Sequence, residues 1–247
     1  MVNTTNCYED GQRAEAYAKL EFPGTYHLAY RDLPDFIHQH VGGRKAVDFG
    51  CGTGRSTRFL RQLGFDVIGA DISIEMIKRA RQLDPQGDYR LLGDDGLGVL
   101  GDGAWDLVLS AFTFDNIPGQ DSKLRILRGL AGLLSGEGKL VNLVSTPEIY
   151  VHEWASFSTK DFPENRGARC GDRVRIVVTD IEDARPVEDV LWPDLDYRAV
   201  FAEAGLEVVA VHKPLGREGE PYPWVNETRI APWVIYVLQQ GALARAR

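Results

Sequence analysis

Residues 48–55 of the chain read Asp-Phe-Gly-Cys-Gly-Thr-Gly-Arg and continue a short apolar run that has the length of a buried β-strand. Three glycines at alternate positions, Gly50, Gly52 and Gly54, let the backbone come close to a ligand and present free N–H groups to it. The segment that follows, RSTRFLRQLG, has the apolar spacing of a helix. The stretch therefore predicts a strand, a glycine turn and a helix, with a ligand bound at the turn.

The residues around the glycines favour a ligand that carries positive charge over a dinucleotide. The dinucleotide fingerprint Gly-x-Gly-x-x-Gly requires a third small residue at position 55, where this chain has Arg55. Dinucleotide sites also have an apolar residue where Asp48 stands, because a carboxylate is repelled by a pyrophosphate. A solvated or turn-capping aspartate is the alternative explanation of Asp48.

Strand-like and helix-like segments alternate on both sides of this turn. Further apolar runs of strand length are FDVIGAD, DYRLLGD, WDLVLSAF and KLVNLVS, and helical spacing is found over residues 28–41, 73–83 and 122–134. In the second of these helices Ser73 is the expected N-cap, and Ile74, Ile77 and Ala80 are expected to face the core. Such an alternation predicts an α/β fold in which a parallel sheet is covered on both faces and binds its ligand at the carboxyl ends of its strands.

The pattern changes after about residue 146. RVRIVVTDI and VEDVLW are expected to pair as an antiparallel insertion, and a helix and two terminal strands follow. We therefore predict a Rossmann-like, doubly wound, seven-stranded and mostly parallel sheet with an antiparallel last strand and a small β insertion after strand five. Glu227, which lies between Trp224 and Trp233 in the sequence, is expected to anchor the C-terminal strands.

Two more acidic positions follow strands of the predicted sheet. Asp71 lies about 20 residues after the first glycine, the spacing at which a carboxylate accepts the hydroxyls of a ribose, and Ile72 beside it offers an apolar face. Asp94, in the run Gly-Asp-Asp-Gly, ends the third strand and is placed to accept a hydrogen bond from an adenine amine. The alternatives are a helix-capping role for Asp71 and an ordinary acidic turn for residues 93–96.

Taken in order, VDFGCGTG, GADIS, LLGDD and WDLVLSAFTFDNIP resemble the successive motifs of class I S-adenosylmethionine-dependent methyltransferases, in their small-molecule branch. The resemblance covers about residues 45–145. It implies S-adenosylmethionine as the cofactor, with Asp48 near its amino group, Asp71 on its ribose and Asp94 at its adenine. The cofactor-binding residues that it implies are Tyr17, Asp48, Gly50, Cys51, Gly52, Gly54, Asp71, Ile72, Asp94, Asp95, Ser110 and Phe112.

The same resemblance divides one methyltransferase domain, residues 1–247, into four parts. An N-terminal helical lid spans residues 1–41, the cofactor-binding core 42–145, an insertion and acceptor lid 146–195, and the C-terminal helix with the last two strands 196–247. The acceptor residues are then expected in the two lids, where aromatic and polar side chains suit a small organic molecule, although core packing is the alternative for each. They are Tyr26, Tyr30, Tyr150, Glu153 and Trp154.

The predicted reaction is in-line transfer of a methyl group to a nitrogen or oxygen atom of a small organic acceptor. Such a site acts chiefly by positioning the acceptor and excluding water, so no metal is expected. A general base is required only for an acceptor that is protonated at neutral pH, and His27 and His152 are the candidates. An NAD-dependent oxidoreductase and a catalytically silent protein of the same fold are the alternatives.

Composition excludes several other classes of partner. The chain has 28 Lys and Arg against 36 Asp and Glu, a formal net charge of −8, so it lacks the basic excess used to bind nucleic acid or an anionic membrane. The Asn-Pro-Pro-aromatic motif of enzymes that methylate nucleic-acid bases is replaced here by Ser-Ala-Phe-Thr-Phe. With three cysteines far apart and no apolar leader, a cytoplasmic location is expected.

Overall fold

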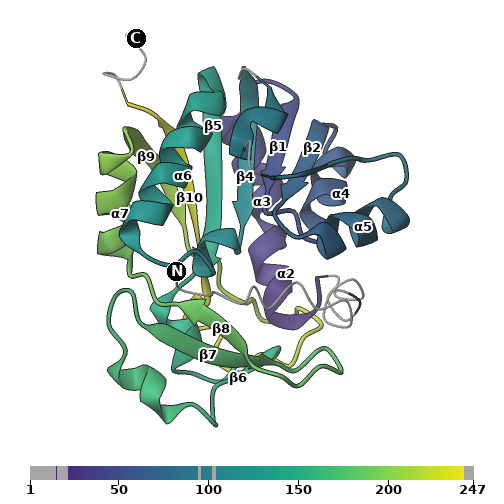
Figure 1. Cartoon of the computed structure of the whole chain (residues 1–247). Coiled ribbons are helices and arrows are strands. Elements are labelled where there is room, and N and C mark those ends of the chain that lie inside the picture. The colour runs from purple at the N-terminus through teal and green to yellow at the C-terminus, as the bar shows by residue number, and fades with distance from the viewer. Residues whose placement is uncertain (1–14, 16–21, 94–95, 102–103, 242–247) are drawn as a thin grey trace.

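The structure is a computed structural model that describes Glu15 and residues 22–93, 96–101 and 104–241. Seven strands form one sheet in the order β3-β2-β1-β4-β5-β10-β9 (Figure 1). The first five are mutually parallel, and β10 runs antiparallel to both β5 and β9, which confirms the predicted sheet. The strands are β1 (Lys45–Phe49), β2 (Asp66–Asp71), β3 (Asp88–Leu91), β4 (Trp105–Ala111), β5 (Leu134–Ser145), β9 (Leu206–His212) and β10 (Trp233–Gln240).

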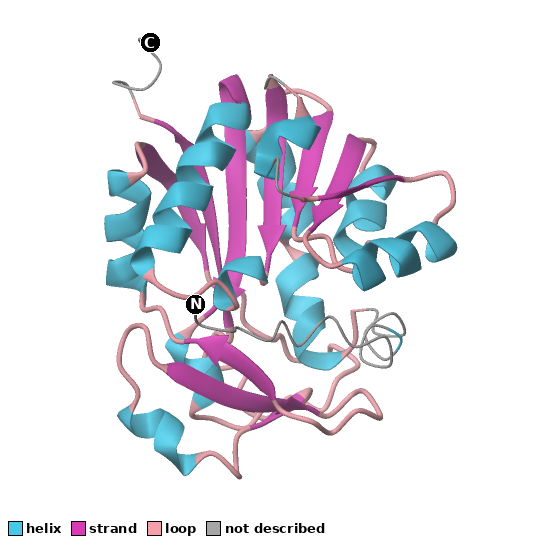
Figure 2. Cartoon of the chain, in the orientation of Figure 1, coloured by secondary structure: helices cyan, strands magenta, loops and turns pink. Residues whose placement is uncertain are grey.

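Helices cover both faces of this sheet (Figure 2). One hydrophobic core joins the first face to helices represented by Leu28, Leu33 and Leu60, and a second core joins the other face to Leu127 and Phe201. The helices on the first face are α2 (Gly24–Arg31), α3 (Leu33–His40) and α4 (Arg55–Gln62), those on the second are α6 (Gln120–Leu133) and α7 (Asp194–Glu203), and α5 (Ile74–Leu83) packs beside β2 and β3. In the described part of the chain, no helix is both long and apolar enough to cross a membrane.

Two local predictions about helices were wrong. Residues 28–41 do not form one helix, because the chain breaks at Asp32 and restarts with a proline in the first turn of α3, where a proline ring is tolerated. Ser73 does cap α5, since its hydroxyl accepts the N–H of Met76 at 3.3 Å. Ile74, however, is 52 % exposed, because Met76 and not Ile74 completes the buried face of α5.

The insertion after β5 forms a second sheet of three antiparallel strands, β6 (Phe157–Ser158), β7 (Arg173–Val178) and β8 (Val187–Val190). The pairing of β7 with β8 was predicted, and β6 adds a short third strand. The inner residues Val174, Ile176 and Val187 belong to the same core as α2 and the main sheet. Figure 1 shows the insertion across the carboxyl ends of the main-sheet strands.

Candidate active site

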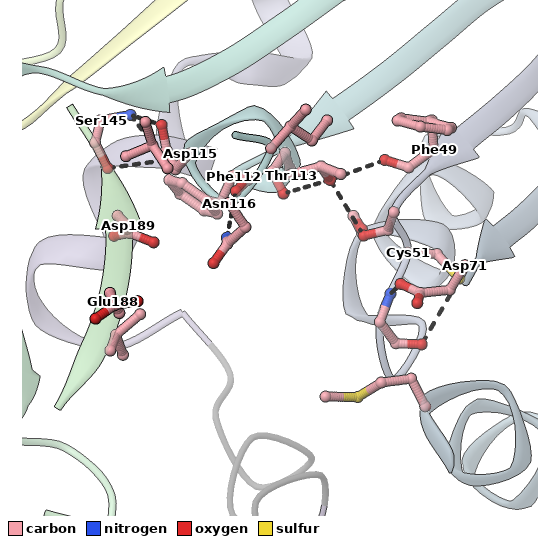
Figure 3. A pocket seen from close by; sticks show the side chains of 18 of the residues that line it. Phe49, Cys51, Asp71, Phe112, Thr113, Asp115, Asn116, Ser145, Glu188 and Asp189 are labelled. Atoms are coloured by element: carbon pink, nitrogen blue, oxygen red, sulfur yellow. Dashed lines mark hydrogen bonds between the residues drawn. The ribbon is translucent and has the colours of Figure 1, made fainter. Parts of the chain in front are cut away.

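A cavity of about 620 Å³ lies between the carboxyl edge of the main sheet and the insertion. The residues on its two sides differ in chemistry. Figure 3 labels residues from each group and shows the two groups on opposite sides of the cavity. We call one side the glycine wall, made of Gly50, Cys51, Gly52, Asp71 and Ile72. We call the other the acidic wall, made of Asp115, Ser145, Tyr150, Glu188 and Asp189.

The three positions of the turn require glycine for different structural reasons. All three have left-handed backbones, with φ of 75° at Gly50, 52° at Gly52 and 83° at Gly54, which glycine adopts without steric cost. A Cβ at Gly50 would lie 2.1 Å from Thr113 Oγ1, and one at Gly54 would lie 2.5 Å from the Tyr89 hydroxyl. A Cβ at Gly52 would meet nothing within 4 Å. Gly50 and Gly54 therefore permit close packing of the turn, whereas Gly52 keeps open space beside the cavity.

Asp71 joins the glycine turn to the start of α5. Its Oδ2 accepts the N–H of Gly52 at 2.9 Å and its Oδ1 accepts the N–H of Ser73 at 2.8 Å. Burial raises the pKa of this carboxyl, and the backbone hydrogen bonds oppose that rise. Each carboxylate oxygen keeps further lone-pair capacity, so Asp71 can still accept hydrogen bonds from a ligand. Ile72 lies beside it with 67 % of its surface exposed.

Asp48 lies behind the glycine turn and does not itself line the cavity. Its Oδ2 accepts the hydroxyls of Ser56 at 2.7 Å and Thr57 at 2.6 Å, and its Oδ1 has no hydrogen-bond partner among the described residues. Burial raises the pKa of Asp48 to about 6. Because Ser56 lines the cavity, the charge of Asp48 reaches a ligand through that hydroxyl.

The acidic wall combines polar side chains from four elements: the 3-10 turns that contain Asp115 and Tyr150, strand β5 with Ser145, and strand β8 with Glu188 and Asp189. The Asp115 carboxylate accepts the backbone N–H of Ser145 at 3.1 Å and the hydroxyl of Ser145 at 2.9 Å. The Tyr150 hydroxyl donates to Asp189 Oδ2 at 3.0 Å. Both aspartates are almost fully buried, and burial raises the pKa of Asp115 to about 6 against the hydrogen bonds from Ser145 and the charge of Lys123.

Aromatic rings close the cavity between the two walls. Phe112 and Trp233 have ring centroids 4.8 Å apart, and Phe157 lies 5.6 Å from Trp233 and 5.0 Å from Tyr26. The guanidinium of Arg55 lies 4.9 Å from the centre of the Tyr26 ring, at a cation–π distance. These contacts place α2, the end of β4, the insertion and β10 around one volume.

Comparison with known proteins adds to this geometry. Residues 47–142 match a family model described as a methyltransferase domain. The N-demethylindolmycin N-methyltransferase of Streptomyces griseus is 28 % identical over 215 residues, which are 85 % of this chain and 90 % of that protein. The CcbJ methyltransferase of Streptomyces caelestis superposes with a TM-score of 0.67 at 19 % identity over 95 % of this chain and 98 % of that one. The chain contains a methyltransferase domain and has the fold of class I S-adenosylmethionine-dependent methyltransferases.

Other relatives of this methyltransferase extend the comparison. The cypemycin N-terminal methyltransferase of a Streptomyces species is 27 % identical over 203 residues, which are 75 % of this chain and 80 % of that protein. A ubiquinone biosynthesis O-methyltransferase of Xanthomonas campestris is 30 % identical over 112 residues, 43 % of this chain and 46 % of that protein. The second match covers less than half of either protein.

The glycine wall of this methyltransferase fits S-adenosylmethionine. The open space at Gly52 leaves room for a ligand close to the backbone, Asp71 retains acceptor capacity for hydroxyls, and the exposed Ile72 offers apolar surface. The carboxylate of Asp48, whose Oδ2 accepts the Ser56 hydroxyl, places negative charge behind Ser56, as a cationic ligand requires. Donors, acceptors and charge at this wall thus agree with the cofactor.

The structure brings many predicted residues of the methyltransferase to the cavity but not all. Gly54 packs on Tyr89 and does not line the cavity. Ser110 is fully buried and does not line the cavity either, because side chains alternate along β4 and that of Ser110 points into the core on one face of the sheet. Tyr17, Asp94 and Asp95 lie outside the described residues. The predicted residues that line the cavity are Gly50, Cys51, Gly52, Asp71, Ile72, Phe112, Tyr26, Tyr30 and Tyr150.

Neither candidate base belongs to the described lining of the cavity. His27 lies 3.5 Å from Glu220 Oε1 and packs on the ring of Tyr222, whereas His152 packs beside Trp154. The predicted acceptor residues Glu153 and Trp154 are absent from that lining as well. The Trp154 indole donates to the Ile149 carbonyl at 2.9 Å, and the Glu153 carboxylate accepts the N–H of Thr159, so both hold the insertion loop together.

Sequence reasoning missed the two aspartates of the acidic wall. Asp115 follows directly after the fourth predicted strand, at the edge where ligands bind, and its position was a usable signal. Side chains alternate along β8, so Asp189 points to the same side as Val187, and an acidic residue therefore lies on the buried face of this strand. A carboxylate in such a position is costly unless it has a role or a partner.

Proposed function

We propose that this methyltransferase transfers a methyl group to a nitrogen or oxygen atom of a small organic acceptor that binds at the acidic wall. The observation that carries the proposal is the pair of chemically different walls on opposite sides of one cavity (Figure 3). S-adenosylmethionine, when bound, supplies an electrophilic methyl group on a positively charged sulfur. An acceptor held at the opposite wall is then positioned for in-line attack.

The glycine wall has the cofactor-binding role in this proposal. Asp71 accepts hydrogen bonds from the ribose hydroxyls, and Ile72 packs on the adenine. Gly50, Cys51 and Gly52 face the methionine part of the cofactor, and Asp48 stabilises its positive charge through Ser56. The support for these roles is the left-handed turn, the retained acceptor capacity of Asp71 and the open space at Gly52.

The rest of the cavity orients the acceptor and excludes water. The rings of Tyr26, Phe112, Phe157 and Trp233 supply apolar surface, and a desolvated site strengthens each polar contact inside it. The volume of about 620 Å³ lies within the range of small-molecule sites. The names of the relatives describe both N- and O-methyltransferases, which supports a small acceptor with either atom.

The predicted division of the chain remains part of the proposal. Residues 1–41 act as a lid, 42–145 hold the cofactor, 146–195 hold the acceptor, and 196–247 complete the sheet. The support is that Tyr26 and Tyr30 of the first part and Tyr150 and Asp189 of the third line the same cavity. Because the chain has a formal net charge of −8, nucleic acid is not proposed as the acceptor. The cytoplasm is the proposed location.

Titration calorimetry tests the cofactor and a product assay tests the reaction. We expect S-adenosylhomocysteine to bind with a micromolar or lower dissociation constant and NAD not to bind. Incubation with S-adenosylmethionine that carries a labelled methyl group should then label small amines, phenols or alcohols, but not DNA or RNA. NAD binding without S-adenosylhomocysteine binding would favour an oxidoreductase, and tight cofactor binding without transfer to any acceptor would indicate a silent protein.

A further inference from the structure

We propose that the acceptor is a protonated amine whose ammonium group binds between Asp115 and Asp189, and that Asp115 takes its proton. The inference rests on the proposed function, because it assigns a chemical class to the molecule that occupies the acidic wall. It makes Asp115 a catalytic residue and Asp189 a binding residue.

Position is the first argument. Asp115 ends the 3-10 turn η3 (Thr113–Asp115), directly after β4, and Asp189 comes from β8 of the insertion. Figure 3 shows both carboxylates on the side of the cavity opposite Asp71, with Phe112 between the two sides. A group held by the two aspartates therefore faces the glycine wall across the cavity.

The second argument is the way in which the Asp115 carboxylate is fixed. Only 4 % of Asp115 is exposed, and both of its oxygens accept the backbone N–H of Ser145, at 3.2 Å and 3.1 Å. The Ser145 hydroxyl donates to Oδ2 as well. Three hydrogen bonds from one residue hold the carboxylate in a single orientation while it still lines the cavity. A preorganised acceptor of this kind suits a donor that must be aligned for proton transfer.

Charge is the third argument. The buried cation nearest in this region, Lys123, donates to the Phe114 carbonyl and packs 4.9 Å from the Trp192 ring and 5.6 Å from the Tyr197 ring. Lys123 is fully buried and is not among the described cavity-lining residues, so it stabilises Asp115 from behind. The two arginines in the described lining of the cavity are engaged by other groups, Arg173 by Glu188 and Arg55 by the ring of Tyr26. The carboxylates of Asp115 and Asp189 therefore present negative charge to this part of the cavity, which attracts an ammonium.

The surrounding rings are an independent observation that fits the same ligand. Tyr26, Phe112, Phe157 and Trp233 line the cavity, and the Phe112 and Trp233 centroids lie 4.8 Å apart. Aromatic faces attract cations and pack on apolar groups, so they suit an amine that carries an apolar body. A phosphate- or carboxylate-bearing acceptor held at this wall would be repelled by the two aspartates.

The proton step balances simply. One N–H proton of the ammonium moves to a carboxylate oxygen of Asp115, and the electron pair of that bond stays on nitrogen as a lone pair. The new nitrogen–carbon bond uses this lone pair, while the pair of the broken carbon–sulfur bond leaves with the thioether sulfur. The carboxylic acid then gives its proton to bulk water after product release.

Calorimetry on isosteric pairs tests the inference without turnover. The protein, saturated with S-adenosylhomocysteine, is titrated with aryl- and alkylamines and with the alcohols of the same shape, such as 2-phenylethylamine and 2-phenylethanol. The variants are Asp115→Asn and Asp189→Asn, which keep side-chain size and remove charge. Glu148→Gln is the matched control, because Glu148 is an exposed carboxylate two residues from Tyr150 that does not line the cavity.

We expect the wild-type protein to bind at least one amine about tenfold or more tightly than its alcohol, the effect of a charge-assisted hydrogen bond. Each aspartate variant should lose that preference, whereas the control should keep it. Thermal melts and S-adenosylhomocysteine affinity verify that the variants are folded, and Asp189→Asn decides alone if Asp115→Asn does not fold.

Three results would overturn the inference: alcohols bind as tightly as amines, no amine binds to the wild-type protein, or both aspartate variants keep the amine preference. Each of these can occur in a protein that binds S-adenosylhomocysteine and methylates hydroxyl groups, so the proposed function would survive. A wild-type protein that does not bind S-adenosylhomocysteine would instead refute the proposed function itself.

Discussion

The two walls of the cavity are built by different means. The glycine wall and the carboxylate behind it are local in sequence: Asp48 accepts the hydroxyls of Ser56 and Thr57, and Asp71 accepts the N–H of Gly52, so no bonded pair is more than 19 residues apart. The acidic wall joins Asp115 to Ser145 over 30 residues and Tyr150 to Asp189 over 39. Cofactor recognition is therefore fixed by one turn, whereas acceptor recognition depends on how distant segments dock.

Glu227 shows what the docking of distant segments requires. This fully buried carboxylate accepts the Thr25 hydroxyl and the Ala155 N–H, both at 2.7 Å, and the N–H groups of Val225 and Asn226 at 2.8 and 3.0 Å. It thereby joins α2, the insertion loop and the segment before β10. Glu227 was predicted to anchor the C-terminal strands, and its partners also lie in α2 and in the insertion loop.

The largest effect is expected at the glycine wall. Gly52→Val places a branched side chain in the open space beside Asp71, so S-adenosylhomocysteine affinity should fall at least about 100-fold by steric exclusion. Calorimetry measures the loss. Gly64→Val is the control, because Gly64 is also left-handed, with φ of 89° and nothing within 4 Å, but does not line the cavity. Equal losses in both variants would mean that backbone strain, and not the cavity, is responsible.

The next effect concerns the assembly of the acidic wall. Glu227→Ala removes a fully buried carboxylate and leaves its four donors without their acceptor, so the free energy of unfolding should fall by about 3 kcal/mol. Chemical denaturation followed by tryptophan fluorescence measures this change, with Glu218→Ala at an exposed position as the control. S-adenosylhomocysteine affinity should change little while the protein remains folded. A large loss of cofactor affinity instead would show that the two walls are not separable.

The difference between the local contacts of the glycine wall and the long-range contacts of the acidic wall also explains which features could be predicted from the sequence. The turn at residues 48–55 and the position of Asp71 depend on local spacing, and the structure places both at the cavity. The position of His27 depends on the rotation of α2: Tyr26 and Tyr30 face the cavity four residues apart, and His27, one residue on, faces Glu220. Sequence spacing alone does not fix that rotation, because it is set by packing against Phe157 and Trp233.

Asp189 was hidden for a related reason. The alternation in VEDVLW predicted a strand, but no local signal shows which sheet a short insertion strand will face. Only the docked insertion puts Asp189 beside Tyr150, and only the turn after β4 puts Asp115 beside Ser145. Long-range contacts of side chains, in contrast to strand and turn patterns, leave little trace in a single sequence.

A moderate effect is expected for Asp71→Ala. Loss of the hydrogen bonds to the ribose should weaken S-adenosylhomocysteine binding by about 1–3 kcal/mol. Because Asp71 also accepts the N–H groups of Gly52 and Ser73, part of the loss will come from the turn itself. Comparison with 2′-deoxy-S-adenosylhomocysteine separates the two: wild type should discriminate against the deoxy ligand, and the variant should not. Undiminished discrimination in Asp71→Ala would refute the ribose contact.

The smallest effect is expected at the acidic wall, and the pH dependence of the reaction identifies it. Burial raises the pKa of Asp115 to about 6, and the groups around it are Lys123 of α6, Asp189 of β8, Tyr150 after β5 and Tyr197 of α7. A base must be ionised, so kcat/KM for an amine should be level near pH 7 and fall about tenfold per pH unit below about 6. The Asp115→Asn variant should be slower near pH 7 and lack this acidic limb, whereas the exposed-site control Glu148→Gln should retain it. An acidic limb that persists unchanged in Asp115→Asn would assign the titration to another group and leave the acidic wall with a binding role alone.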